Sequence, residues 1–63
     1  MKIIKAQQFE YYMLSLDGIH INFDSFEHRD GNVTLIRGNE IAGIIWQDKA
    51  PEFFRAWGAM QCK

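Results

Sequence analysis

The sequence has little that could hold it together covalently or place it in a membrane. Among its 63 residues only Cys62 is a cysteine, so no internal disulfide can form. The chain therefore lacks the covalent links of small secreted domains, and its cysteine content is typical of a reducing compartment. No apolar stretch of signal-peptide length follows Met1, and the longest apolar run, Ile41 to Trp46, is interrupted by Gly43. Because that run is far too short to span a bilayer, we expect a cytoplasmic protein without a membrane partner.

An excess of either charge is also missing. Seven Lys and Arg residues stand against eight Asp and Glu residues, giving a net charge of −1, and neither sign is clustered. There is no basic stripe to bind phosphates and no acidic block to imitate nucleic acid. The length of 63 residues excludes a dinucleotide-binding fold or a large enzyme cleft. A core of this size is only marginally stable, so a partner would stabilise it.

What the sequence does have is the pattern of a small sheet. Asp17-Gly18, Asp30-Gly31 and Gly38-Asn39 supply residues that tolerate a positive φ, as two-residue hairpin turns require. Runs of strand length surround them at residues 9–16, 19–24, 32–37 and 40–47, and residues 2–6 form a further strand or the start of the first. These runs predict an antiparallel meander of four or five strands.

The last segment has helical spacing. Pro51 suits the first turn of a helix, and Glu52 suits its dipole. Apolar residues then recur three and four positions apart, at Phe53, Ala56, Trp57 and Met60. We expect a helix over residues 51–61 that packs on one face of the sheet. The predicted class is thus α+β, one domain over residues 1–63: a small antiparallel β-meander of four or five strands with one C-terminal α-helix.

The turns also predict which residues pair across the strands. The first turn pairs Leu16 with Ile19, Leu14 with Ile21 and Tyr12 with Phe23, which gives the helix an apolar face to cover. The second and third turns pair Phe26 with Leu35, Asp24 with Arg37 as an ion pair, Ile36 with Ile41 and Val33 with Ile44. In this register Ile36 lies under the helix.

The same register predicts a second apolar face. It collects Phe26, Val33, Leu35, Ile44 and Trp46, which we take as the candidate protein-interaction surface. One short helix cannot cover both faces of a sheet, so an apolar second face implies a partner. The alternative is a bulge or longer turn within residues 25–31. It would move Val33, Leu35, Ile44 and Trp46 under the helix and would expose Ile36 and Ile41.

The residues that carry chemistry form no convincing site. Glu27, His28 and Asp30 are too few for structural zinc and are expected to be solvated loop side chains. Ser15 is predicted to lie across from His20, within hydrogen-bond reach, but without an orienting acid or a pocket. Cys62 has no motif around it. We therefore expect no catalytic residue, no metal and no cofactor.

The functional prediction is a small non-enzymatic protein that acts through protein–protein contacts. Its partner is a second copy of the chain in a homo-oligomer, with a dimer favoured, or another protein, and the two are not exclusive. Small accessory regulators or inhibitors of the phage or mobile-element type act in this way. The alternative is a nucleic-acid-binding regulator, because small sheets with exposed aromatic residues stack single-stranded bases. Phe9, Tyr11, Phe26 and Trp46 would form that platform.

Overall fold

The protein, as a computed structural model, is described over residues 1–6 and 10–61. Within these residues the elements are, in order, β1 (Lys2–Lys5), β2 (Tyr12–Leu16), β3 (Ile19–Phe23), β4 (Ser25–Arg29), β5 (Asn32–Arg37), β6 (Glu40–Ile45) and α1 (Ala50–Gln61). The strands form two three-stranded antiparallel sheets, ordered β1-β2-β3 and β4-β5-β6. The α+β class and the C-terminal helix are confirmed. The prediction of a single meander of four or five strands is wrong, because six strands divide between two sheets.

The two Asp-Gly turns adopt the conformation that their sequence predicts. Asp17 and Gly18 have φ values of 49° and 80°, and Asp30 and Gly31 have 53° and 82°. A positive φ at both central residues is the mark of a type I′ turn, whose twist matches that of the flanking strands. These turns fix the predicted pairs Leu14–Ile21 and Phe26–Leu35, both of which are confirmed.

A corner at Asp24 separates β3 from β4, and β4 covers residues 25–29, which lie outside the predicted strand runs. The backbone N–H of Asp24 donates to the carbonyl of Ile36 at 2.8 Å, and its carboxylate accepts a hydrogen bond from the N–H of Gly38 at 2.7 Å. Asp24 therefore ties the corner to the β5–β6 turn. The predicted ion pair with Arg37 is not formed, since the Arg37 guanidinium lies 5.3 Å from the ring centre of Tyr11.

The corner changes which residues face the interior. Phe23 and Phe26 are three positions apart, yet both pack toward the helix, because two exposed residues at the corner separate them. As a result Val33 and Leu35 are fully buried instead of lying on a second face. Ile36, predicted to lie under the helix, belongs to the opposite face. The first sheet keeps the predicted register and the second sheet is turned over relative to it.

A second irregularity occurs in β6. Leu35 lies opposite Gly43 and Ile36 opposite Ile41, so Ala42 is one residue more than β5 can match. Such a bulge reverses the alternation of side chains beyond it. The predicted pair Ile36–Ile41 is confirmed, but the pair Val33–Ile44 is wrong, because Val33 lies opposite Ile45.

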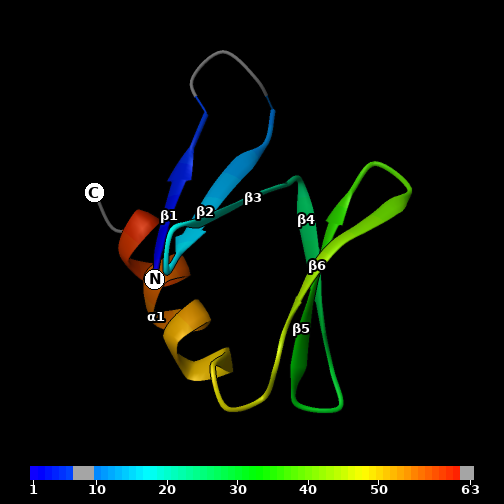
Figure 1. Ribbon diagram of the computed structural model, residues 1–63, viewed down its shortest axis with the longest axis vertical. Coiled ribbons are helices and arrows are strands. Elements are labelled where there is room, and N and C mark those ends of the chain that lie inside the picture. Colours follow the sequence, from blue (N-terminus) through cyan, green and yellow to red (C-terminus); the bar gives the residue numbers. More distant parts are fainter. Residues whose placement is uncertain (7–9, 62–63) are drawn as a thin grey trace.

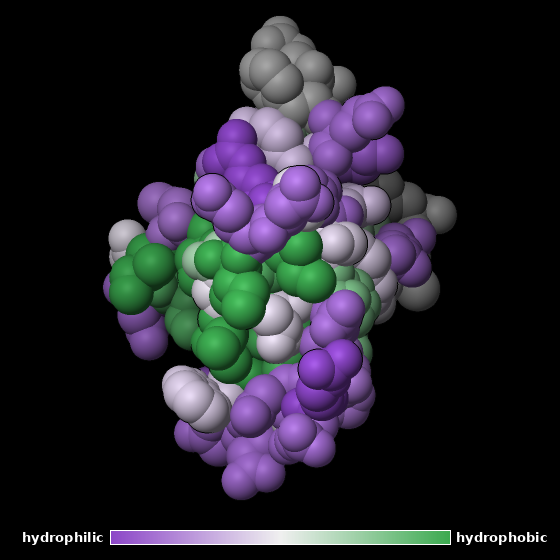
Figure 2. Space-filling view, turned by 90° about the vertical axis from the view of Figure 1, so that its right-hand side faces the viewer, coloured by the Kyte–Doolittle hydropathy of each residue, from purple (hydrophilic) through white to green (hydrophobic). Residues whose placement is uncertain are grey.

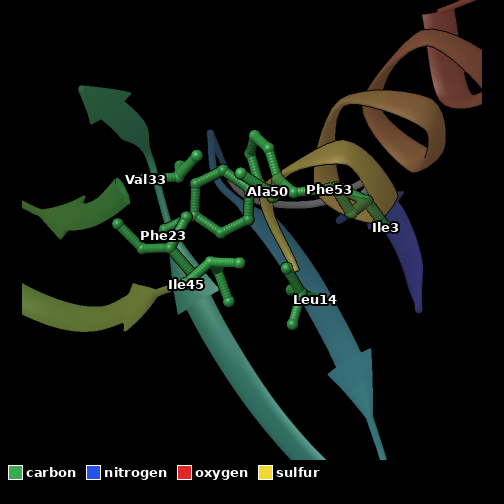
Figure 3. Close-up of a cluster of buried hydrophobic side chains, with 8 residues drawn as sticks. Ile3, Leu14, Phe23, Val33, Ile45, Ala50 and Phe53 are labelled. Atoms are coloured by element: carbon green, nitrogen blue, oxygen red, sulfur yellow. The ribbon is translucent and has the colours of Figure 1, made fainter. Parts of the chain in front are cut away.

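The core lies where the two sheets and the helix meet. Figure 1 shows α1 beside β1 and β2, with the β4–β6 sheet on the other side of the molecule. In Figure 3, Phe23 at the end of β3 lies between Val33 and Ile45 of the second sheet and Phe53 of the helix. The buried residues are Ile3, Leu14, Phe23, Val33, Leu35, Ile45, Ala50 and Phe53. None of them is polar or charged, so the core depends on apolar packing alone.

The helix begins at Ala50, one residue before the predicted start, and buries the predicted apolar stripe. Phe53 is fully buried, and Ala56, Trp57 and Met60 pack against the core. Gly58 lies within the helix, where a Cβ atom would meet nothing within 4 Å. We expect Gly58→Ala to raise the free energy of unfolding by about 1 kcal/mol, because alanine loses less backbone entropy in a helix. Urea unfolding followed by circular dichroism measures the change.

Gly18→Ala is the matched control for this prediction. Its Cβ would also meet nothing within 4 Å, but Gly18 has a φ of +80°, which an L-residue rarely adopts. We expect it to lower stability by about 1 kcal/mol. If Gly58→Ala and Gly18→Ala changed the free energy of unfolding by the same amount, Gly58 would not lie in a regular helix.

Candidate functional site

The structure separates the five residues of the predicted interaction surface. Val33 and Leu35 have no exposed surface. Phe26 is half-buried, with its ring centre 4.9 Å from that of Phe53 and 5.0 Å from that of Trp57. Ile44 and Trp46 are 44% and 62% exposed. The first three residues therefore belong to the interior, and only Ile44 and Trp46 are available to a partner.

The outward face of the β4–β6 sheet nevertheless carries an apolar patch. Cross-strand partners share a face, so Ile41, which is 66% exposed, lies on the same side as Ile36. Ile44 lies opposite Thr34, between the buried residues of β5, and also points outward. We call Ile36, Ile41, Ile44 and Trp46 the outer patch. Figure 2, viewed from the β4–β6 side, shows an apolar patch with hydrophilic residues above and below it.

The outer patch is apolar along β6, and the same face becomes charged along β4. Glu27 lies opposite Thr34, and Arg29 lies opposite Asn32. The Arg29 guanidinium is 3.7 Å from the Glu27 carboxylate, and both side chains are well exposed. An exposed ion pair of this length contributes little to stability. It does place one charge of each sign beside the outer patch, two residues apart on one strand.

The sequence held a signal for part of this arrangement. Gly43 interrupts an otherwise apolar strand, and a glycine there indicates a bulge or a close approach of another segment. Both occur: the register shifts beside it, and a Cβ atom on Gly43 would lie 3.1 Å from Cδ1 of Ile21 in β3. Exposure of Ile36 and Ile41 was predicted only for the alternative register, because their face depends on the corner at Asp24.

The predicted contact between Ser15 and His20 is present on the outward face of the first sheet. The Ser15 hydroxyl lies 2.9 Å from Nδ1 of the imidazole, and the pair is exposed. Lys2 lies opposite Ser15 in the neighbouring strand. Within residues 1–6 and 10–61 no carboxylate is hydrogen-bonded to His20, so the serine has a possible base but the base has no orienting acid. The arrangement is that of a polar sheet surface.

Other candidate sites offer less. No group of three or more His, Cys, Asp or Glu side chains that could hold a metal occurs in the described part of the chain. A shallow hollow of about 330 Å³ lies beside the helix, lined by Met1, Glu52, Arg55, Ala56 and Ala59. Its two charged side chains, Glu52 and Arg55, are of opposite sign and define no ligand. Among the residues that are described, no helix is long and apolar enough to cross a membrane.

The four aromatic residues of the predicted base-stacking platform do not come together. Phe9 lies outside the described residues. Tyr11 is half-buried beneath Arg37, and Phe26 packs against the helix. Trp46 is the one of the four that is strongly exposed among the residues described. A single exposed ring cannot stack successive bases.

Comparison with other proteins adds no assignment. No protein-family model matches the sequence, and no curated protein or solved structure is significantly similar to it. Any function must therefore be inferred from the surface itself.

Proposed function

We propose that this protein acts by binding protein through the outer patch, without a catalytic step. The observation that carries the proposal is the exposure of Ile41, Ile44 and Trp46 on one face of a sheet. Tryptophan is enriched among the residues that dominate protein interfaces, and exposed apolar clusters on small domains mark interaction sites.

Trp46→Ala tests the proposal. The side chain is largely exposed, so its removal is expected to lower the free energy of unfolding by less than about 1 kcal/mol. Self-association is measured by sedimentation, and binding of other proteins is measured by their capture on the immobilised chain. In either measurement the dissociation constant is expected to rise at least tenfold, which corresponds to about 1.4 kcal/mol of binding free energy. Because the contact is apolar, it should persist between low and moderate salt.

Ile19→Ala is the matched control, because Ile19 is 61% exposed but lies on the first sheet. It should leave binding unchanged. Binding that survives Trp46→Ala, or that falls equally with Ile19→Ala, would contradict the proposal. Captured nucleic acid whose retention falls steeply with salt would instead favour the base-binding alternative.

A further inference from the structure

The outer patch also indicates what covers it. We infer that its occupant is a second copy of this chain, stacked face to face on the β4–β6 sheet about a two-fold axis that crosses the strands. This inference rests on the proposed function and goes beyond it by naming the partner. It follows from the order of residues along β6 and β4.

The apolar side of the sheet is self-complementary under this axis. Ile44 and Trp46 are two residues apart and both are exposed, and Trp46 follows the end of β6 directly, so the alternation of the strand carries it to the same face as Ile44. An axis that passes between these two positions sets the two copies of β6 antiparallel to each other. Each Ile44 then lies over the Trp46 of the other copy. Sheets stacked in this way are about 10 Å apart, which these side chains can fill.

The charged side of the sheet fits the same axis. Thr34 lies opposite both Ile44 and Glu27, so Glu27 is level with Ile44 across the sheet. Arg29 is two residues further along β4, level with Asn32. The axis that exchanges Ile44 and Trp46 therefore also sets Glu27 of each copy opposite Arg29 of the other. An axis along the strands would place charged β4 over apolar β6, which would desolvate the Glu27–Arg29 ion pair of each copy against apolar side chains.

The area that this axis brings together indicates a weak dimer. The exposed parts of Ile44 and Trp46 amount to roughly 250 Å² in each copy. Ile41 lies further along β6 and falls outside this contact, near the β4–β5 turn of the other copy. With Glu27 and Arg29 at its border, the contact buries roughly 800 Å² in total, which is in the range of weak, transient interfaces. We therefore expect the monomer to dominate in dilute solution.

Sedimentation equilibrium from about 1 µM to 1 mM tests the inference directly. The chain should pass from monomer to dimer and form nothing larger, because a two-fold interface is closed. Glu27→Arg and Arg29→Glu, tested separately, should each weaken the dimer by about tenfold through like charges facing each other. The two variants mixed, or both changes in one chain, should restore it. Circular dichroism at low concentration checks that each variant folds.

The outcomes separate the inference from the proposed function. A monomer at every concentration overturns the second copy as occupant, and capture of another protein that Trp46→Ala abolishes would still uphold protein binding. A dimer that persists in Trp46→Ala overturns both the second copy as occupant of the outer patch and the proposal that this patch binds protein. A dimer lost with Trp46→Ala but indifferent to both charge reversals overturns the axis proposed here.

Discussion

Phe53→Ala is expected to remove more than half of the free energy of unfolding of the isolated chain. Phe53 has no exposed surface, and its ring is stacked on Trp57 at 13° and lies 4.9 Å from the ring centre of Phe26. Its truncation leaves a cavity where the helix meets both sheets, at a cost of about 3–5 kcal/mol. A chain of this length has a total stability of roughly 3–9 kcal/mol. Urea unfolding followed by far-ultraviolet circular dichroism measures the loss.

Phe54→Ala is the control, because it removes the same side chain one position further along the helix. Phe54 is 36% exposed and lies against His28 at the border of the core. We expect it to lower the free energy of unfolding by about 1 kcal/mol. A loss as large as that of Phe53→Ala would mean that the helix packs through a different face.

The features that could be predicted from the sequence are those fixed by neighbouring residues. The Asp17-Gly18 and Asp30-Gly31 turns need a positive φ at both positions, and two-residue turns fix the register of the strands that they join. The helix follows from Pro51 and the apolar spacing after it. In each case a few consecutive residues contain the whole signal, so contacts with distant segments do not alter the result.

The relation between the two hairpins could not be predicted in this way. Each hairpin has its own correct register, but the corner at Asp24 decides which face of the second hairpin meets the first. Its hydrogen bonds reach Ile36 and Gly38, more than ten residues away in the chain. Alternation of apolar residues is satisfied by either orientation, because both faces of residues 25–46 carry apolar side chains. The bulge at Ala42 then reverses, for the rest of β6, which side chains face the core and which face outward.

The candidate site shows the consequence of these two reversals. The corner alone would bury Ile44 and Trp46 together with Val33 and Leu35, as the predicted alternative register had it. The bulge returns Ile44 and Trp46 to the outward face, where they join Ile36 and Ile41. The outward face of the second sheet is thus apolar, but only two of the five residues predicted for the interaction surface, Ile44 and Trp46, belong to it. Whether a partner binds there stays a prediction.

Two adjacent isoleucines in β6 test the bulge itself. Ile45 is 5% exposed and lies opposite Val33, whereas Ile44 lies on the outer patch. We expect Ile45→Ala to lower the free energy of unfolding by about 2–4 kcal/mol, since it removes buried methyl groups and leaves a cavity. Ile44→Ala is expected to lower it by about 1 kcal/mol or less. Urea unfolding at a concentration where the chain is monomeric measures both.

The same pair of variants should rank in reverse for self-association. Ile44→Ala removes part of the outer patch and should raise the dissociation constant of the dimer several-fold, or roughly 1 kcal/mol. In urea unfolding the order is the opposite: the midpoint concentration of urea should be lower for Ile45→Ala than for Ile44→Ala. If Ile44→Ala were instead the more destabilising of the two, β6 would have the register without the bulge, with Ile44 opposite Val33. Trp46 would then face the core, and the outer patch would lose the residue on which protein binding most depends.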